Sequence, residues 1–165
     1  MVLGNISDAP LQTQLEHEFS RRGVSIERLT FHAKKSIPEY LALHGEVDII
    51  LDTFPYCGGT TTWFAIWMGV PILTYVWNSL PGRGGFGALS VLELQDKFAA
   101  HTEAEFIELA KSWSTNIDEL QSLRHQLRGR MQNGRMKPEN VARGLEKGLT
   151  MMWQRFCSGL PVESF

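Results

Sequence analysis

Apolar and polar positions in the first half of the chain fall into blocks with helical and extended periodicity in turn. One face of a helix is predicted by an apolar residue at every fourth position: Leu11, Leu15 and Phe19. The segment 24–31 then alternates as a strand does. A second helix is predicted at 36–44, with Ser36 as its cap. Residues 1–5 look like the tail of a strand, so we expect a further segment of protein before them.

The stretch 47–75 organises the rest of this pattern. It opens on an apolar run bounded by turn residues, which is typical of a buried parallel strand. Pro55 lacks an N–H and cannot continue a strand, and the glycine pair at 58–59 permits a sharp turn. The stretch therefore predicts three elements around a glycine loop: a strand at 47–51, a helix at 60–69 and a strand at 71–75.

Helices dominate the second half of the predicted structure. After a loop rich in glycine and proline, a short helix is expected at 88–94 and an extended piece at 97–100. Longer helices are expected to begin at Thr102, Asp118 and Pro138. Strands that alternate with helices predict an α/β fold, here a Rossmann-like parallel sheet of about four to six strands with flanking helices. We expect one domain over 1–165, with its helical part at about 102–157.

Composition and charge narrow the classes of function. The 165 residues are 43% hydrophobic and 21% charged, which is ordinary for a globular domain. A formal net charge of −2 provides no basic field, and so argues against nucleic acid or an anionic membrane as a general partner. No apolar stretch is long enough to cross a bilayer. Cys57 and Cys157 lie far apart, and no Cys or His spacing predicts a metal site. We therefore expect a metal-free protein of the cytoplasm.

The glycine loop carries the strongest chemical signal. Gly59, Thr60, Thr61 and Thr62 combine the free N–H groups of a helix start with hydroxyls, at the carboxyl end of a predicted strand. Such a group of donors suits an anion, above all a phosphate. The structural alternative is a tight strand-to-helix turn in which a threonine caps the helix.

Neighbouring side chains also have two interpretations each. Asp52 could orient a ligand hydroxyl or cap the loop. His32, at the carboxyl end of a predicted strand, could touch a ligand or lie in solvent. The pair Lys34–Lys35 could attract a diphosphate or form a solvated loop. Phe54 and Tyr56 could stack on a base or sugar, or pack under the loop.

The stretch Val47–Thr62, which reads VDIILDTFPYCGGTTT, resembles the O-linked N-acetylglucosamine transferase family, as does Trp67–Ile72 after it. The similarity is greatest to its bacterial, Spindly-type members and extends over roughly Leu3 to Phe156. The most specific part is the core in which LDT is followed by a proline, a glycine and a threonine pair.

This resemblance implies the C-terminal half of a two-lobed (GT-B) glycosyltransferase. That half binds a nucleotide-sugar donor, such as UDP-N-acetylglucosamine, without a metal or another cofactor. By position, Gly59–Thr62 matches the family's diphosphate-contacting stretch, and Arg83 lies in a loop where members carry an arginine. The resemblance also implies an N-terminal lobe, tetratricopeptide repeats upstream, and a protein acceptor. Since the acceptor-side groups belong to the other lobe, no catalytic residue is assigned here, and this chain alone is expected to be inactive.

Two positions depart from the family pattern. Tyr40 stands where relatives have a histidine near the donor, and Phe64 stands where they place an acidic residue on the ribose hydroxyls. A phenyl ring cannot accept the hydrogen bonds that a carboxylate accepts. The alternatives to a transferase lobe are therefore a binding or scaffold module that has lost the donor, and a lobe of a sugar epimerase with the same two-lobed fold.

Overall fold

The structure, a computed structural model, describes residues 1–164. Strands and helices alternate over the first hundred residues, and helices alone follow. The strands are β1 (Val2–Leu3), β2 (Thr30–Phe31), β3 (Ile50–Leu51), β4 (Ile72–Tyr75) and β5 (Ala99–Ala100). The helices are α1 (Ala9–Arg21), α2 (Ile37–Leu43), α3 (Thr60–Trp67), α4 (Gly84–Val91), α5 (Gln95–Phe98), α6 (Glu103–Thr115), α7 (Ile117–Asn133) and α8 (Pro138–Cys157), with short 3-10 turns at Ile26–Arg28 and Leu80–Gly82.

The strands form parallel sheets, as predicted, but not one sheet. β1 pairs with β2, and β3, β4 and β5 form a separate three-stranded sheet in that order. The α/β class is confirmed, and the expectation of one continuous sheet is wrong. Apart from β4, each strand has only two residues, so each pairing is short and β1 is not bonded to β3. The chain thus forms the pair of β1 and β2 first and then begins a second sheet at β3.

Several predicted bounds need correction. The segment 24–31 is not a strand throughout, because Ile26–Arg28 forms a 3-10 turn in which Leu29 N–H bonds to Ile26 O, leaving only β2 extended. The helix predicted at 88–94 begins four residues earlier, at Gly84. The start of the piece predicted as extended at 97–100 lies in α5. The helices predicted from Ser36 and Thr102 are confirmed with their caps: Ser36 forms a capping box, and the Thr102 side chain accepts a bond from Glu105 N–H.

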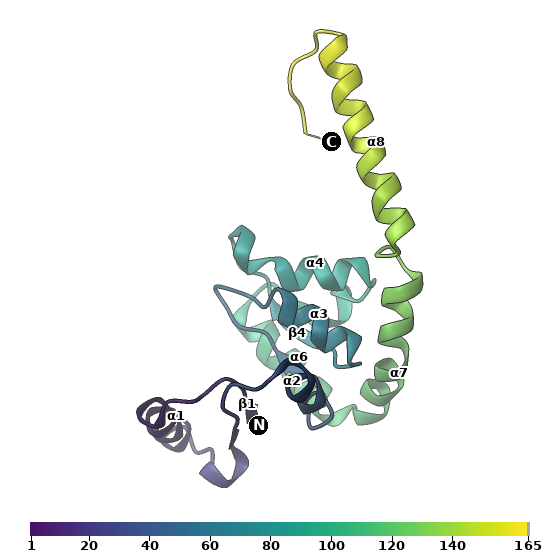
Figure 1. Cartoon of the computed structure of the whole chain (residues 1–165). Helices are drawn as coiled ribbons and strands as arrows, with labels where there is room; N and C mark the ends of the chain where they lie inside the picture. Colours follow the sequence, from purple (N-terminus) through teal and green to yellow (C-terminus); the bar gives the residue numbers. More distant parts are fainter. Residues whose placement is uncertain (165) are drawn as a thin grey trace.

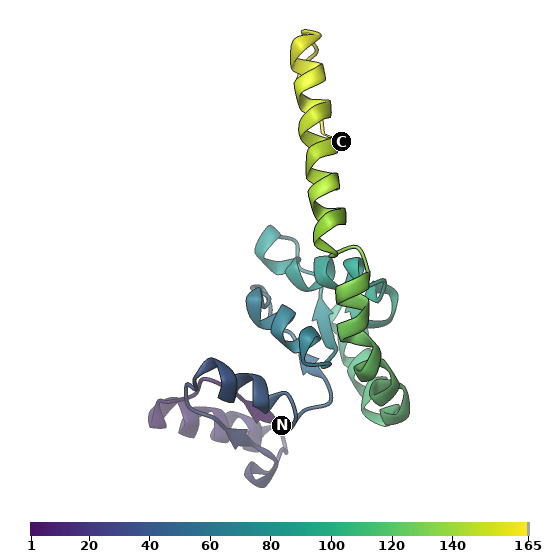
Figure 2. The same cartoon turned by 45° about the vertical axis from the view of Figure 1, so that its right-hand side comes forward.

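The apolar core is formed by the part of the chain that runs from β3 to α7 in the sequence. The largest fully buried side chains include Phe98, Ile66, Ile72, Leu73, Leu89 and Leu127. The ring of Phe98 stacks on Trp113 of α6, with centroids 4.4 Å apart. By contrast, only Leu29 and His44 are buried among residues 1–46. The first two strands and α1 therefore form a thinner unit, which lies beside the body at the lower left of Figure 1 and Figure 2.

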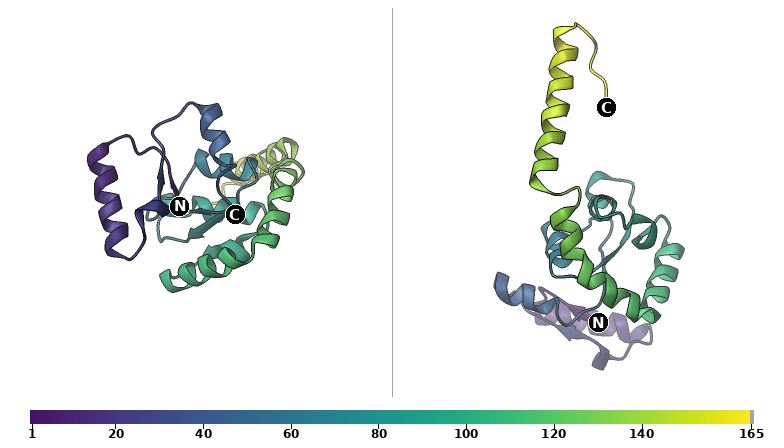
Figure 3. Two further views of the ribbon diagram at one scale, coloured as in Figure 1. Left: turned by 90° about the horizontal axis from the view of Figure 1, so that it is seen from below. Right: turned by 90° about the vertical axis from the view of Figure 1, so that its right-hand side faces the viewer.

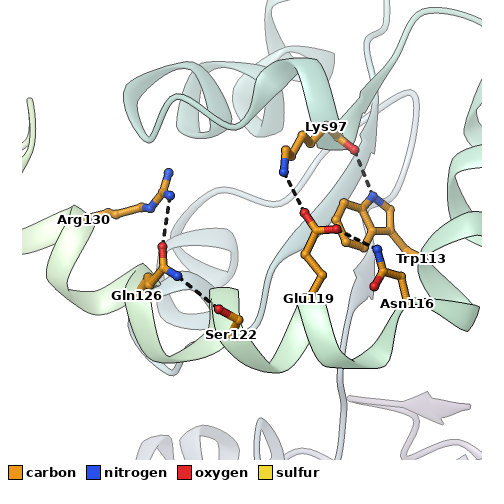
Figure 4. Close-up of polar contacts among 7 residues, drawn as sticks. All are labelled: Lys97, Trp113, Asn116, Glu119, Ser122, Gln126 and Arg130. Carbon is orange, nitrogen blue, oxygen red and sulfur yellow. Dashed lines mark hydrogen bonds and ion pairs between the residues drawn. The ribbon is translucent and has the colours of Figure 1, made fainter.

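A polar network at the body's edge fixes the turn between α6 and α7 (Figure 4). The indole Nε1–H of Trp113 donates to Lys97 O at 3.0 Å, and Lys97 Nζ lies 2.7 Å from a carboxylate oxygen of Glu119. Asn116 donates to the other oxygen of the same carboxylate at 2.7 Å. These bonds hold the start of α7 against α5, so that α7 can pack along the core.

Helix α8 leaves the body and buries none of its residues. Figures 1 and 2 and the right-hand view of Figure 3 show it projecting away from the sheets, with the tail that follows it folded back alongside. The tail is held by Arg155, whose guanidinium donates to Pro161 O at 2.8 Å and pairs with Glu163 at 2.7 Å. An apolar stripe at helical spacing is exposed along α8: Val141, Leu145, Leu149, Met152 and Phe156. Within residues 1–164, no helix has the length and apolar character needed to span a membrane.

Arg124 of α7 joins the body to the segment that enters β3. Its guanidinium donates to Val47 O at 2.7 Å and also to His44 O, the carbonyl at the end of α2. Since Gly69 packs so close to Arg124 that a Cβ there would lie 2.8 Å from its carbonyl oxygen, α3 meets α7 at the same point. This arginine therefore sets how α2 approaches β3.

We predict that Arg124→Gln lowers the free energy of unfolding by about 1–3 kcal/mol, because it leaves two partly buried carbonyls without their charged donor. Urea unfolding followed by circular dichroism measures the change. Arg143→Gln on the exposed surface of α8 is the matched control and should shift stability by less than about 0.5 kcal/mol. Equal effects of the two substitutions would contradict this role of Arg124.

Candidate functional site

The glycine loop, residues 52–59, connects β3 to α3 and is held in place by hydrogen bonds to the carboxylate of Asp52. One carboxylate oxygen accepts bonds from Thr53 N–H at 3.0 Å and Gly58 N–H at 2.9 Å. The other oxygen accepts from the Thr74 hydroxyl of β4 at 2.9 Å. Burial raises the pKa of the Asp52 carboxyl above its ordinary value of 3.8, although the three bonds act in the opposite direction. Both oxygens of Asp52 are thus engaged by the protein itself.

Helix α4 packs against the loop without room for a side chain. A Cβ on Gly85 would lie 2.4 Å from an oxygen of Asp52 and 2.6 Å from the Thr74 hydroxyl oxygen. The buried thiol of Cys57 donates to Pro81 O at 2.8 Å, and Gly84 N–H donates to the same sulfur at 3.1 Å. The start of α4 and the Thr74 hydroxyl of β4 therefore both hold the loop in place.

The start of α3 opens to solvent. Gly59 is its N-cap, and the N–H groups of Gly59, Thr60 and Thr61 have no hydrogen-bond partner within residues 1–164. All three residues are exposed, whereas Thr62 is buried. A Cβ on Gly58 would lie 2.6 Å from the Thr62 hydroxyl oxygen and 2.9 Å from that of Thr61, so these hydroxyls lean back over the loop. Free N–H groups and a hydroxyl at a helix start favour an anion.

A cavity of about 600 Å³ lies where the chain turns back from the first sheet to the second. Its walls come from β1, the loop after β2, α2, β3 and α3. The lining residues are Val2, Gly4, Asn5, Ala33, Lys34, Lys35, Ile37, Tyr40, Leu43, His44, Val47, Ile50, Thr61 and Phe64. The lining includes residues that come just after β1 and β2, so the cavity adjoins carboxyl ends of strands, where ligands bind in open α/β sheets.

The cavity combines two cationic side chains with an aromatic wall. Lys34 and Lys35 are exposed and form no ion pair among the described residues. In the same lining, the ring of Tyr40 meets Phe64 edge-on, with centroids 6.3 Å apart, and its centroid lies 5.0 Å from that of buried His44. Burial raises the pKa of the Tyr40 hydroxyl above its ordinary value of 10.0, so the phenol is neutral at physiological pH. The lining of the cavity therefore includes both positively charged and aromatic side chains.

The structure brings some of the predicted site residues together. Tyr40 and Thr61 both line the cavity, and the exposed Gly59 and Thr60 directly precede Thr61. The buried Thr62 belongs to the core side of α3. Of the predicted phosphate-binding stretch Gly59–Thr62, Thr61 alone is in the lining of this cavity.

The other predicted residues lie elsewhere. Asp52 accepts hydrogen bonds from the loop and from Thr74, which agrees with the interpretation that it caps the loop. His32 does not line the cavity, and its Nε2 lies 3.3 Å from a carboxylate oxygen of Glu46. Arg83 precedes α4, outside the cavity lining, and its Nε–H donates to Trp77 O at 3.3 Å. No three His, Cys, Asp or Glu side chains are grouped as metal ligands would be within residues 1–164.

Phe54 and Tyr56 differ from each other in the structure. Phe54 takes part in an aromatic cluster, edge-on to Tyr75 at 5.2 Å and stacked on Trp77 at 6.2 Å. Tyr56 is 72% exposed. The packing interpretation therefore holds for Phe54 but not for Tyr56.

Sequence reasoning missed the residues that support the loop. Thr74 reads only as a strand residue, and Gly85 as one glycine in a loop that in fact belongs to α4. The available signal was the polar residue in an otherwise apolar strand, because a hydroxyl buried there must find a partner. Asp52, an acid next to the apolar strand, was its natural acceptor.

Comparisons with known proteins identify the family of the chain. Residues 9–139 match the family model described as Glycosyl transferase family 41. The probable UDP-N-acetylglucosamine–peptide N-acetylglucosaminyltransferase SPINDLY of Oryza sativa subsp. japonica is 36% identical over 122 residues, which are 73% of this chain and 13% of that protein. The UDP-N-acetylglucosamine–peptide N-acetylglucosaminyltransferase of Caenorhabditis elegans is 28% identical over 144 residues, 86% of this chain and 12% of that protein.

A solved structure shows the same fold. The K341M mutant of the Thermobaculum terrenum O-GlcNAc transferase superposes with a TM-score of 0.84 at 29% identity, over 96% of this chain and 31% of that one. The α/β arrangement of parallel strands and flanking helices therefore occurs within an O-GlcNAc transferase of GT-B fold. The chain spans only about 13% of the length of the curated relatives named first.

We predict that Gly85→Ala lowers the free energy of unfolding by about 1–3 kcal/mol, since the new methyl group would overlap the buried oxygens of Asp52 and Thr74. Gly87→Ala, in the same helix but with open space around its Cβ, should instead raise stability by up to about 1 kcal/mol. Thermal and urea unfolding of both variants measures the contrast. A Gly85→Ala protein as stable as the Gly87→Ala protein would show that α4 does not clamp the loop.

The raised pKa of Asp52 predicts a pH dependence. Because the folded protein holds the proton of this carboxyl more tightly than the unfolded chain, its contribution to stability falls as the pH rises from about 3.8 through the raised value. Asp52→Asn removes this dependence, so the stability of the native protein relative to the variant should fall over that window and then level off. Urea unfolding from pH 3.5 to 7 measures it, with the exposed Asp118→Asn as control. A difference that grows with pH would contradict the assigned direction.

Proposed function

The chain belongs to glycosyl transferase family 41, and we propose that it forms the donor-binding lobe of a protein O-glycosyltransferase. The donor in this proposal is a UDP-sugar of the UDP-N-acetylglucosamine kind, because the related proteins are named for that donor and for peptide acceptors. The chain resembles one part of those longer proteins, so the activity proposed is that of an assembly to which this lobe contributes.

One observation carries the proposal. Thr61, in the first turn of α3 where the N–H groups of Gly59, Thr60 and Thr61 have no partner among the described residues, lines the same cavity as Lys34 and Lys35. Helix-start N–H groups and ammonium groups are the donors that proteins use to hold phosphate oxygens. With a volume of about 600 Å³, the cavity is within the range of small-molecule sites and leaves room for a nucleoside next to the diphosphate.

The chemistry assigned to this lobe is stabilisation of the leaving group. In sugar transfer to a hydroxyl, the bond between the anomeric carbon and the diphosphate oxygen breaks, and negative charge grows on the diphosphate. The N–H groups of Gly59, Thr60 and Thr61 are fixed in place by the supported loop, so they can stabilise this charge without reorganising. The resemblance to the family implies that no metal takes part in this role, and we propose none.

The remaining parts of the reaction are proposed to come from other segments. We propose that an N-terminal lobe supplies the acceptor-side groups and that tetratricopeptide repeats upstream present the protein acceptor. Both cysteines of this chain are free thiols, the state that a reducing cytoplasm maintains, and we propose that compartment.

A binding module that has lost the donor is the second candidate function. Phe64 and Tyr40 favour it, because they make the α3 side of the cavity apolar where a nucleotide presents hydroxyls. Such a module would bind a partner but not a nucleoside diphosphate. The same titration separates the two functions.

We predict saturable binding of UDP, measured by isothermal titration calorimetry, and at least about 10-fold weaker binding by Thr61→Val, which removes a hydroxyl that bonds a charged oxygen. Lys34→Ala/Lys35→Ala should also weaken binding and reduce its dependence on salt. Thr150→Val, at an exposed position of α8 remote from the loop, is the matched control and should bind as the native protein does.

Absence of binding at millimolar UDP would exclude donor recognition and support the binding module. Equal binding by the Thr61→Val and Thr150→Val proteins would place the nucleotide elsewhere. Turnover of UDP-N-acetylglucosamine without an acceptor would instead indicate an epimerase lobe.

A further inference from the structure

Residues 1–46, which form the N-terminal unit, share almost no core with the body. The buried apolar cluster of the body, with the partly buried side chains packed against it, is drawn from positions 47–131. Neither α1 nor α2 has a buried residue, and Leu29 is the one buried apolar side chain of the unit. Figures 1 and 2 show β1 and β2 beside the body, away from the three-stranded sheet. The hydrophobic effect therefore contributes little to holding the unit on the body.

Few polar contacts join the unit to the body. Within residues 1–164, one side-chain hydrogen bond crosses between them, from Arg124 of α7 to the carbonyl oxygen of His44. One aromatic contact crosses as well, between the rings of Tyr40 and Phe64. In the same part of the chain, no ion pair, strand pairing or backbone hydrogen bond crosses. The continuous backbone that enters β3 is thus the main connection.

The cavity of about 600 Å³ lies between these two parts. Lys34, Lys35 and Tyr40 enter its lining from the unit, whereas Thr61 and Phe64 enter it from the body. Separation of the unit from the body would therefore remove one wall of the cavity. A ligand that contacts both walls gains contacts that exist only while the unit is in place, so its binding favours that state.

The unit has little to keep its own structure once it leaves the body. Its sheet consists of two strands of two residues each, paired at Val2 with Thr30 and at Leu3 with Phe31. A two-stranded sheet without a core is marginal in water. Separation from the body should therefore also break the hydrogen bonds inside the unit. Such a partial opening costs less free energy than unfolding of the whole chain.

We propose that the N-terminal unit is a lid over the cavity. It opens as one cooperative unit while the body stays folded, and a ligand bound between the two walls holds it closed. The opening follows from the contacts of the ligand-free chain. The choice of a nucleoside diphosphate as the ligand rests on the proposed function. The lid lies within this chain and works without any other part of the assembly.

Hydrogen exchange followed by mass spectrometry measures the opening in the ligand-free chain. Hydrogen-bonded amides of α1, β2 and α2 should have protection factors at least about 10-fold lower than those of β4 and α7. Ile72→Val, at a fully buried position of β4, should lower the protection factors of the body by about 2- to 10-fold. Because the unit opens without unfolding the body, its own protection factors should not change. Ile107→Val, at a position of α6 that is 51% exposed, is the matched control and should alter neither part.

The same measurement with UDP tests closure of the lid. At a UDP concentration about 100 times the dissociation constant, the protection factors of the unit should rise about 100-fold, because the open state lacks one wall of the site. Calorimetry on the same sample gives the dissociation constant and shows that the nucleotide is bound.

The outcomes separate the lid from the proposed function. If Ile72→Val lowers the protection of the unit and the body by the same factor, the chain unfolds as one domain and the lid is overturned. If UDP binds but leaves the protection of the unit unchanged, the unit does not close over the ligand, and the lid is overturned while donor binding stands. If UDP does not bind, the proposed function fails together with ligand-held closure, and the exchange of the ligand-free chain still decides whether the unit opens by itself.

Discussion

The buried carboxylate of Asp52 is the interaction on which the site depends. Its three hydrogen bonds join the end of β3, the glycine loop and the hydroxyl of Thr74 on β4. Removing one partner from such a buried network leaves unpaired polar groups, which costs more than the bond itself contributes. Gly85 then closes the arrangement, because only a residue without a side chain lets α4 approach the carboxylate. The position of the α3 start follows from these contacts.

The cavity depends in turn on the break between the two sheets. β1 and β3 are not bonded to each other, and both contribute to the wall of the same cavity. The thin N-terminal unit supplies the lysines and Tyr40, while the well-packed body supplies Thr61 and Phe64. A ligand that bound both sides would therefore add contacts between two parts that share little core, with Arg124 as their connection through α7.

Much of the fold could be predicted from periodicity, since the helices at Ser36, Thr102 and Pro138 carry clear start signals. The sheet was predicted less well, because strands of two residues carry almost no pattern and a parallel pairing leaves no local signature. For the site, Thr61 and Tyr40 follow from motif and position, and the structure places both in one cavity. The polar Thr74 in an apolar strand signals a buried hydrogen bond, but its partner Asp52 lies 22 positions away. The close approach of Gly85 could not be predicted, since it depends on how α4 packs.

The central claim is that the supported start of α3 binds a diphosphate. The most direct test follows the amide signals of Gly59, Thr60 and Thr61 in ¹H–¹⁵N NMR spectra as UDP is added. The account predicts that these three signals shift together, saturate at one dissociation constant and move with signals of Lys34 and Lys35. Saturable shifts confined to other parts of the chain, with these amides unchanged, would contradict it.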